Sequence, residues 1–320
     1  MKAVAIQSTG ARCAIDYIDM PCPRPGPHEL LVAVKAAGVN RDDCSCPHRP
    51  YHQSVPAEQA AFIPGREACG TVSGKGAEVR GFALGDDVVT FTDLIHGRSG
   101  SHAELTVVPA SYAARKPARL SYDEAAALPV DGAMAYRALF TVGRIREGET
   151  VLIHGCSYSQ GHIACQLAAC VRARTIAVRT AHQQKPEMST RPERLTIGSE
   201  EYVVFLRSAP RIDLLVDFVG DSHAYELMGK VRTGGRIVST RLPYNDTVST
   251  IVHERQIEYS RLVGVYPDGE LLDRVARLAC GGMLQPAVAS VMPLREANRA
   301  YMQARQHLDG KIVLSNEVTD

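Results

Sequence analysis

Residues 150–166, with the sequence TVLIHGCSYSQGHIACQ, constrain the fold more than any other stretch of the chain. The apolar, β-branched run at 151–153 predicts a buried strand, residues 155–161 predict a turn, and apolar residues at 163, 167 and 171 predict a helix with one apolar face. A strand, a glycine turn and a helix begin a dinucleotide-binding unit, because the helix N-terminus presents free N–H groups and a positive dipole end to a pyrophosphate. Only Gly155 and Gly161 remain in this turn, so an ordinary buried connection is the alternative.

The length and charge of the chain limit its class. At 320 residues it is long for a single core, so we expect two domains. A net charge of +1 gives no reason to expect nucleic acid or a membrane surface as a partner, and no apolar run is long enough to span a bilayer. The first residues already alternate like a strand, so no signal peptide is expected. Nine scattered cysteines, several in apolar segments, favour reduced thiols and a cytoplasmic location.

The N-terminal third of the chain has an all-β texture. Short strands are expected at residues 4–6, 30–34, 70–72, 87–91 and 105–108, separated by turns rich in glycine, proline and aspartate. Many short strands joined by such turns predict a small barrel. The polar, irregular segment 43–61 is expected to form a loop over a site.

From residue 121 the pattern changes to alternating helices and strands. Ser121 caps a predicted helix that Pro129 interrupts, and further strands are expected at 175–178, 213–218 and 236–239. A helix is expected at 223–231, closed by residues 233–235. This alternation predicts a parallel sheet with helices on both faces. A tail with helices at 270–279 and 296–306 and a last strand at 311–314 is expected to return to the first domain.

Several short motifs occur in a fixed order along the chain. They are AGVN at 37–40 with Asp43, IPGREACG at 63–70, GFALGD at 81–86, HAE at 102–104, LSYDEAAALP at 120–129, AYRALF at 135–140, GETVLIHG at 148–155, DLLVD at 213–217 with Val219 and Gly220, GGRIV at 234–238 and GKIVL at 310–314. With this set, the sequence resembles the medium-chain dehydrogenase/reductase superfamily, in its zinc-free branch similar to quinone oxidoreductases and enoyl reductases.

The resemblance implies an α/β protein of two domains. A GroES-like β-barrel domain would comprise residues 1–120 and 262–320, and a Rossmann domain with a doubly wound parallel sheet would comprise residues 121–261. The active site would lie in the cleft between them. The resemblance also implies reduction of a quinone, enone or other activated double bond by NADPH, in a homodimer that binds a small-molecule substrate.

The zinc ligands of the zinc-dependent relatives are absent from the matching positions. Asn40 stands in the place of a ligating cysteine and Arg66 in the place of a ligating histidine, and residues 90–105 contain no cysteine for a structural zinc lobe. We therefore expect no metal. A soft metal held by Cys44, Cys46 and His48 is the alternative, with loop cysteines that bind no metal as the favoured interpretation.

Three residues are candidates for catalysis. By its position in the resemblance, Asn40 would donate a hydrogen bond to the substrate or the nicotinamide, and Tyr51 would donate one to the substrate or the cofactor. A turn residue and a packed loop aromatic are the respective alternatives. A second cleft tyrosine of the relatives is replaced by Ser45. Asp131 stands where relatives have a small apolar residue, and could act as an acid or a base, or be a surface or capping residue.

The cofactor site departs from the family pattern. Two glycines of the turn are replaced, so its candidate contacts are Ser157, Tyr158, Ser159, Gln160 and Gly161. After the second strand, Arg179, Thr180 and Lys185 favour the 2′-phosphate of NADPH over the ribose hydroxyls of NADH, with a solvated charged loop as the alternative. The resemblance adds Thr240 and Lys311 to the cofactor site.

The sequence thus leaves two hypotheses of different class. The first is a zinc-independent, NADPH-dependent reductase of an activated double bond. The second is a redox-inactive family member with a degenerate cofactor loop, which uses the cleft for binding or for cofactor-free chemistry around Asp131. The altered glycine turn favours the second hypothesis, whereas the basic residues after the second strand and the chain-wide motifs favour the first.

Overall fold

The computed structural model describes residues 1–8, 13–43, 62–94, 99–179, 192–208, 211–306 and 309–317. The chain divides into two compact units, Met1–Val130 with Tyr266–Asp320 (unit 1) and Asp131–Val265 (unit 2). The helix α2 (Pro129–Tyr136) runs across the first boundary. Both observed boundaries fall later in the chain than the predicted ones at 120/121 and 261/262.

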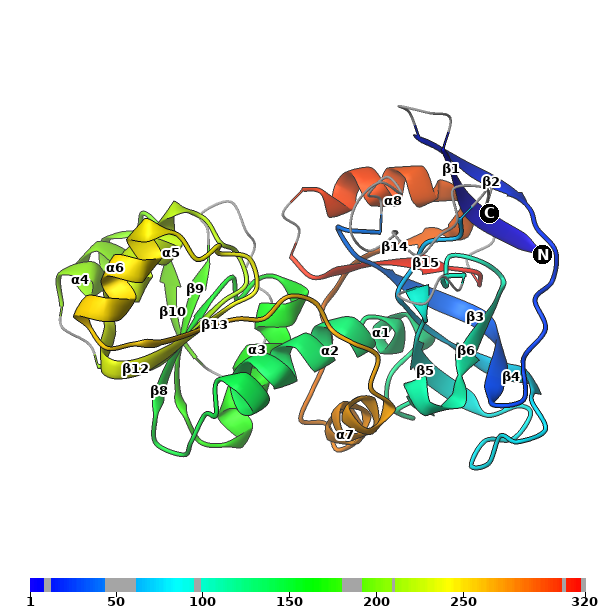
Figure 1. Cartoon of the computed structure of the whole chain (residues 1–320), viewed down its shortest axis with the longest axis horizontal. Helices are drawn as coiled ribbons and strands as arrows, with labels where there is room; N and C mark the ends of the chain where they lie inside the picture. The colour runs from blue at the N-terminus through cyan, green and yellow to red at the C-terminus, as the bar shows by residue number, and fades with distance from the viewer. Residues whose placement is uncertain are drawn as a thin grey trace. The chain divides into compact units, whose positions relative to one another are not determined.

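Unit 1 contains a seven-stranded sheet. Its strands are β3 (Glu29–Val39), β4 (Glu67–Lys75), β5 (Asp87–Phe91), β6 (Leu105–Pro109), β7 (Ala113–Arg115), β14 (Val288–Pro293) and β15 (Lys311–Ser315), in the order β14-β15-β3-β4-β5-β7 with β6 also paired to β3. The long strand β3 is central, because it pairs antiparallel with β4, β6 and β15. A separate hairpin joins β1 (Lys2–Ser8) to β2 (Cys13–Asp19). The C-terminal strand therefore returns to the first unit, as the sequence predicted (Figure 1).

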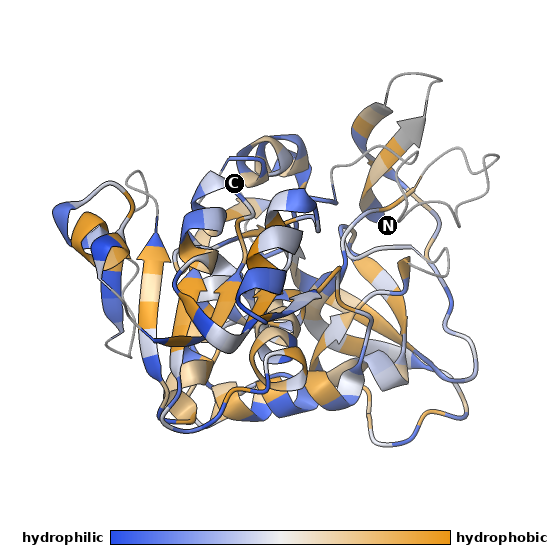
Figure 2. Cartoon of the chain, turned by 60° about the vertical axis from the view of Figure 1, so that its left-hand side comes forward, coloured by the Kyte–Doolittle hydropathy of each residue, from blue (hydrophilic) through white to orange (hydrophobic). Residues whose placement is uncertain are grey.

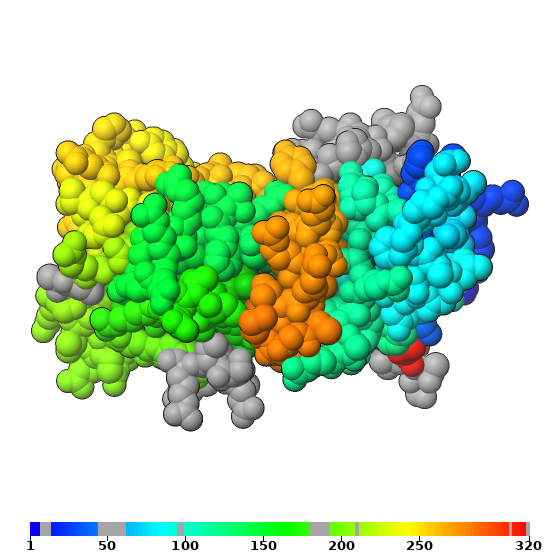
Figure 3. All heavy atoms as spheres, turned by 90° about the horizontal axis from the view of Figure 1, so that it is seen from below, coloured from blue at the N-terminus to red at the C-terminus, as the bar shows by residue number. Residues whose placement is uncertain are grey.

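Unit 1 also contains several helical segments, of which α7 (Gly269–Cys280) shows a clear apolar stripe. They are η3 (Ala110–Tyr112), α1 (Tyr122–Ala126), α7, η5 (Leu294–Glu296) and α8 (Ala297–Ala304). In α7, Leu272, Val275, Ala276 and Ala279 follow the helical spacing and are buried, so this stripe faces the core. Arg274 and Arg277 lie on the opposite side and are exposed, and α7 forms part of the surface seen in Figure 3.

Unit 2 has a six-stranded sheet in which all strands are parallel. Its order is β10-β9-β8-β11-β12-β13, formed by β8 (Thr150–His154), β9 (Arg174–Arg179), β10 (Glu193–Thr196), β11 (Ile212–Asp217), β12 (Val231–Ser239) and β13 (Glu258–Arg261). The strands appear as a hydrophobic layer in Figure 2, because parallel strands are covered on both faces. The strand order reverses between β8 and β11, which is the arrangement of the Rossmann fold.

The helices of unit 2 lie on both sides of this sheet (Figure 1). They are the π-helical segment η4 (Arg137–Val142), α3 (Ser159–Cys170), α4 (Glu200–Arg207), α5 (Ser222–Met228) and α6 (Asp246–Glu254). The predicted GroES-like and Rossmann architectures are therefore both confirmed, the first as an antiparallel sheet domain and the second as a doubly wound parallel sheet.

Three local predictions need correction. Helix α3 begins at Ser159, so Gly161 lies within the helix and the turn is shorter than expected. Helix α5 ends at Met228, and the segment 233–235 belongs to β12 and does not close a helix. Gly234 has φ of 69°, and the register between β11 and β12 shifts in this region, so the glycine pair marks an irregularity within a strand.

Candidate functional site

The end of β3 and the starts of β4 and β15 meet at one edge of the unit 1 sheet. Both neighbours run antiparallel to β3, so their first residues lie beside its end, where Ala37 pairs with Ala68 of β4 and Val39 pairs with Ile312 of β15. This topology brings together Asn40, which follows β3, Glu67, which begins β4, and Lys311, which begins β15. All three side chains are buried.

These three residues form a closed polar cluster, which we call the lysine cluster. The Lys311 Nζ donates to Asn40 Oδ1 at 2.8 Å and lies 2.6 Å from Glu67 Oε1. The same Glu67 oxygen accepts a hydrogen bond from Asn40 Nδ2 at 2.9 Å, and Oε2 accepts one from the backbone N–H of Val130 at 2.7 Å. Among the described residues, none of the polar atoms of these three side chains belongs to the buried atoms that lack a hydrogen-bond partner.

The lysine cluster fixes the orientation of the Asn40 amide. The ammonium group can only donate and the carboxylate can only accept, so Oδ1 must face Lys311 and Nδ2 must face Glu67. One N–H of the amide then remains for another acceptor. Gly38 permits this arrangement, because a Cβ atom at Gly38 would lie 2.6 Å from Glu67 Oε1.

A buried histidine adjoins the lysine cluster in unit 1. In the ring of His102, Nδ1 lies 2.5 Å from the hydroxyl oxygen of Tyr301, and Nε2 lies 3.3 Å from the carbonyl oxygen of Gly38. A neutral ring that accepts at Nδ1 and donates at Nε2 satisfies both contacts. Burial lowers the pKa of His102, which agrees with a neutral ring.

In unit 2, polar side chains gather where the strand order reverses. His154 ends β8 and Asp217 ends β11, and these two strands are neighbours. The His154 Nδ1 lies 3.0 Å from Asp217 Oδ1, and the Ser239 hydroxyl, at the end of β12, donates to Asp217 Oδ2 at 2.7 Å. Crevices at such carboxyl ends are where doubly wound folds bind ligands.

Asp217 holds the loops that follow these strands. Its Oδ1 accepts hydrogen bonds from the backbone N–H groups of Val219 and Gly220, each at 3.0 Å. Burial alone would raise the pKa of Asp217, but the hydrogen bonds from His154, Ser239 and Gly220 outweigh it, and the pKa is lowered. Asp217 is therefore a carboxylate that orders this end of the sheet.

The N-terminus of α3 lies at the same end of β8. Side chains cap five other helices at their N-termini, namely Ser121 for α1, Ser199 for α4, Asp221 for α5, Asn245 for α6 and Asp268 for α7. At α3 the N-cap residue is Tyr158, and within the described part of the chain no side chain caps the helix. The N–H groups of its first turn are thus not bonded by a capping side chain, and such groups can bind an anionic ligand.

Buried polar atoms surround this helix start. Ser157 Oγ, Ser159 Oγ and His154 Nε2 are buried and, within the described residues, have no hydrogen-bond partner. Such atoms are costly unless a ligand or water satisfies them. Hydroxyl donors beside an uncapped helix N-terminus fit the pyrophosphate of a dinucleotide, so the residues present are compatible with the predicted cofactor.

The two remaining glycines of the turn are required by the backbone. Gly155 has φ of 91°, which favours glycine. A Cβ atom at Gly161 would lie 2.1 Å from the carbonyl oxygen of Gly155, so this position keeps the helix close to the strand.

Two arginines act on the turn from the neighbouring strands. Arg179 ends β9 and Arg194 lies in β10. Burial raises the pKa of the Cys156 thiol to about 11, and the positive charges of Arg194 and Arg179 oppose this rise. Both arginines therefore bring positive charge near the turn, and Arg179 ends its strand where doubly wound folds bind ligands.

The structure brings together only part of the predicted site. The start of α3 brings together Ser157, Tyr158, Ser159, Gln160 and Gly161. In unit 1, Asn40 and Lys311 are in contact with each other. Thr240 donates its backbone N–H to the carbonyl oxygen of Asp217 at 2.9 Å. Asp131 lies in the first turn of α2 and is buried, which excludes the surface alternative. Tyr51, Thr180, Lys185, Ser45, Cys44, Cys46 and His48 lie outside the described residues.

Sequence reasoning did not assign roles to Glu67, His154, Asp217, Ser239 and Arg194. Three of these residues end strands, and polar residues at the carboxyl ends of parallel strands are a signal that could have identified them. Glu67 had no such signal, because its partners are distant in the sequence.

Neither a metal site nor a membrane segment is found in the described part of the chain. Among these residues, no group of three or more His, Cys, Asp and Glu side chains could hold a metal ion, and no helix is long and apolar enough to cross a membrane. Burial raises the pKa of Cys69, which disfavours the thiolate that a metal would need.

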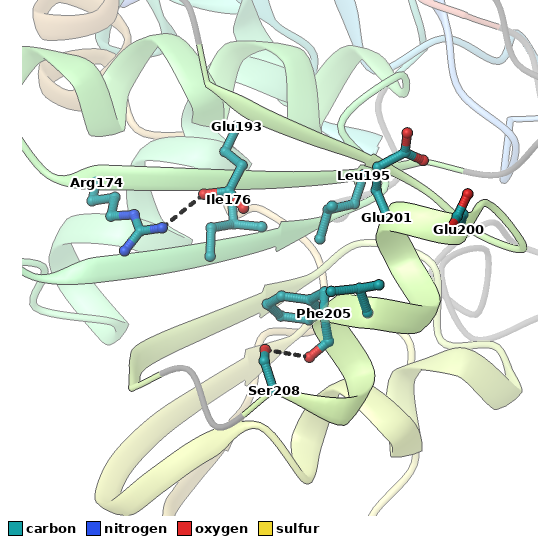
Figure 4. Close-up of a pocket in the computed structure, with 9 residues that line it drawn as sticks. Arg174, Ile176, Glu193, Leu195, Glu200, Glu201, Phe205 and Ser208 are labelled. Carbon is teal, nitrogen blue, oxygen red and sulfur yellow. Dashed lines mark hydrogen bonds and ion pairs between the residues drawn. The ribbon is translucent and has the colours of Figure 1, made fainter.

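A hollow of about 470 Å³ lies at the β10 edge of the unit 2 sheet (Figure 4). It includes Arg174 and Glu193, the first residues of β9 and β10, which form an ion pair at 2.8 Å. The Ser208 hydroxyl donates to the carbonyl oxygen of Phe205 at 2.7 Å. These polar groups are engaged with one another and do not converge on a ligand, so we assign no function to this hollow.

Comparison with known proteins identifies the family. A model of the alcohol dehydrogenase GroES-like domain matches residues 26–118, and a model of zinc-binding dehydrogenases matches residues 198–314. The chain is 27% identical over 321 residues to the synaptic vesicle membrane protein VAT-1 homolog of Danio rerio, covering 90% of this chain but only 64% of that protein. It is 25% identical over 346 residues to acryloyl-coenzyme A reductase of Metallosphaera sedula, covering 98% of this chain and 100% of the relative.

Further similarities extend over the whole chain. Quinone oxidoreductase of Lama guanicoe is 26% identical over 335 residues, covering 98% of this chain and 97% of that protein. The crystal structure of an alcohol dehydrogenase superfamily protein from Novosphingobium aromaticivorans superposes with a TM-score of 0.83 at 25% identity, covering 99% of this chain and 100% of that one. The sheet topology, the two domain matches and these relatives agree, and the chain belongs to the medium-chain dehydrogenase/reductase superfamily, a family of NAD(P)H-using oxidoreductases.

Proposed function

We propose that this protein is a zinc-independent reductase that uses NADPH to transfer a hydride to the electron-poor carbon of a quinone, an enone or another activated double bond. One observation carries the proposal: the start of α3, at the switch point of a Rossmann sheet, is uncapped within the described residues and flanked by the buried, unpartnered hydroxyls of Ser157 and Ser159. A pyrophosphate would satisfy these groups.

The preference for NADPH rests on positive charge near the turn. Arg179, the last residue of β9, and Arg194, the second residue of β10, both act electrostatically on Cys156, and such charge favours a 2′-phosphate. No acidic residue occurs between Arg179 and Glu187, so the sequence shows no carboxylate close after the strand to bind ribose hydroxyls.

The substrate class is inferred from relatives and from the lysine cluster. A quinone oxidoreductase and an acryloyl-coenzyme A reductase are among the similar proteins. Asn40 and Arg66 stand where zinc-dependent relatives have a ligating cysteine and histidine, which favours a reaction without zinc. The positive charge in the lysine cluster comes from Lys311, which contacts Asn40 directly.

Bound NADPH would supply the hydride, and the protein would stabilise the charge that develops on the substrate. Negative charge would develop on the conjugated oxygen of the substrate. Asn40 would donate its remaining N–H to this oxygen, and Lys311 would strengthen that donor by polarising the amide through Oδ1. Glu67 would keep the amide in the donating orientation.

A second candidate function is supported by Tyr158. Its ring lies against Gly155 in the turn, where two glycines of the family pattern are replaced. A redox-inactive member that uses this fold for binding or for cofactor-free chemistry around Asp131 would explain that change.

Titration with NADPH and with NADH distinguishes the two functions. Binding of NADPH should raise the unfolding free energy by about 2.7 kcal/mol at a hundredfold excess over the dissociation constant, which a thermal shift assay detects. We expect NADPH to bind more tightly than NADH, and Arg194→Ala to remove this preference while leaving NADH binding unchanged. Oxidation of NADPH with quinones and enones then tests the reaction, with Asn40→Leu expected to reduce kcat. Absence of binding of either nucleotide would contradict the reductase and favour the second candidate.

We also propose that the reductase is a homodimer, in line with the family resemblance. Among the described residues, β13 is an outermost strand of the unit 2 sheet, and an edge strand offers backbone groups for such pairing. The mass in solution, measured by light scattering, tests this.

A further inference from the structure

The turn after β8 contains two kinds of position, which the structure separates. Gly155 and Gly161 are fixed by the backbone, through a positive φ at the first and a close approach of the chain at the second. Tyr158 has φ of −68° and ψ of 149°, an extended conformation that any residue adopts. The fold therefore does not require glycine at 158, and a glycine there would serve only the approach of a ligand.

The side chain of Tyr158 lies at the switch point of the sheet. A Cβ atom built on Gly155 would be 2.8 Å from Tyr158 Cδ2 and 2.7 Å from Val219 Cγ2. The tyrosine ring and the valine side chain therefore meet on one face of Gly155. Gly155 follows β8 and Val219 lies in the loop after β11, so the ring lies between the two loops that border the ligand crevice.

A pyrophosphate and this ring compete for the same approach to α3. The phosphate oxygens need the N–H groups of the first helical turn, and the N-cap of that turn is Tyr158, whose ring lies against Gly155 and brings no positive charge. The backbone of Tyr158 is anchored, because its N–H donates to the Gly155 carbonyl at 3.0 Å and its carbonyl accepts from the His162 N–H at 2.8 Å. The ring can therefore leave only by rotation of the side chain.

We propose that Tyr158 is a gate over the phosphate site: its ring covers the N-terminus of α3 in the free protein and must rotate away before the pyrophosphate of a dinucleotide binds. This inference rests on the proposed function. The gate lowers nucleotide affinity by the cost of displacing the ring, and it makes Tyr158 the residue that sets the affinity of this chain for dinucleotides.

The test compares nucleotide binding to the wild type, Tyr158→Gly and the matched control Tyr158→Phe by isothermal titration calorimetry. Tyr158→Gly should bind NADPH about tenfold more tightly than Tyr158→Phe, which keeps the ring, and than the wild type. Adenosine 2′-monophosphate lacks the pyrophosphate, so its affinity should be the same for all three proteins. Glycine is tolerated at an N-cap, so the variant is expected to fold, and its urea unfolding curve checks this.

The outcomes separate the gate from the proposed function. Tighter binding of NADPH to Tyr158→Gly alone supports the gate, including the case in which the wild type does not bind measurably. Equal NADPH affinity of all three proteins overturns the gate and leaves the reductase intact. If Tyr158→Gly bound adenosine 2′-monophosphate more tightly by the same factor as NADPH, the gate would also be overturned, because the ring would then affect ligands that have no pyrophosphate. Failure of every variant to bind NADPH overturns both proposals.

Discussion

The lysine cluster of unit 1 and the turn after β8 in unit 2 are both buried and polar, but they differ in how completely their atoms are paired. Glu67 uses both carboxylate oxygens, and Lys311 contacts both Glu67 and Asn40. In the turn, Ser157 Oγ and Ser159 Oγ have no partner among the described residues. One region is satisfied within the chain, and the other has hydrogen-bonding capacity left over.

This difference separates two roles of buried polar groups. A network whose members satisfy one another contributes to a unique structure, and its loss is costly. A buried hydroxyl without a partner costs free energy in the free protein, so its retention is better explained by a ligand. The lysine cluster is therefore the preorganised part of the proposed site, and the turn is the part that a ligand completes.

The largest expected effect comes from opening the lysine cluster. Lys311→Met removes the ammonium group that lies 2.6 Å from the buried Glu67 carboxylate. Removing one partner of a buried ion pair costs about 3–5 kcal/mol, so we expect a loss of this size in the free energy of unfolding. Urea unfolding followed by circular dichroism measures it.

The exposed pair Lys2–Asp19 provides a matched control for this substitution. Its Nζ–Oδ2 distance of 2.8 Å is similar, but both side chains are solvent-exposed. Lys2→Met should therefore change stability little, because water screens an exposed pair. Equal effects of the two substitutions would show that the lysine cluster is not a structural unit.

Much of the fold was predictable because it follows from local periodicity. The apolar run at 151–153, the strands at 175–178 and 213–218 and the Ser121 cap all correspond to observed elements. The strands β2, β7, β10, β13 and β14 were missed. In β13 and β14, the sequences EYSR and VASVMP lack a clear apolar alternation. The glycine pair at 234–235 was interpreted as a turn, since local sequence does not distinguish a turn from an irregular strand.

The site was predictable only where a motif is contiguous. Residues 157–161 were identified as a group because they follow one strand in the sequence. The contact between Asn40 and Lys311 joins positions 271 residues apart, and only the antiparallel pairing of β3 with β4 and β15 creates it. The sequence around Asn40 or around Lys311 alone therefore does not predict that the Asn40 amide is held between an ammonium and a carboxylate group.

A smaller effect concerns the pH dependence of stability next to the lysine cluster. Burial lowers the pKa of His102, so the unfolded chain, with a histidine pKa of about 6.5, binds the proton more readily than the folded one. The stabilisation is therefore complete above about pH 6.5 and falls as the pH decreases toward the folded pKa, by at most about 1.4 kcal/mol per pH unit. Urea unfolding at several pH values should show a shallower dependence for His102→Gln than for the wild type. If the wild type and His102→Gln showed the same dependence of stability on pH, the pKa of His102 would be the same in the folded and unfolded states, which would contradict the prediction.

The smallest expected effect compares the capped start of α1 with the open start of α3. In α1, Ser121 and Glu124 form a capping box, so Ser121→Ala should lower the unfolding free energy by about 1 kcal/mol. In α3, Tyr158→Ser supplies a hydroxyl to N–H groups that no described side chain caps, and should raise the unfolding free energy by a few tenths of a kcal/mol, because lost ring packing offsets part of the cap. Urea midpoints of the two variants measure both. If Tyr158→Ser destabilised the protein as much as Ser121→Ala, the start of α3 would already be satisfied within the chain, and its contrast with the lysine cluster would disappear.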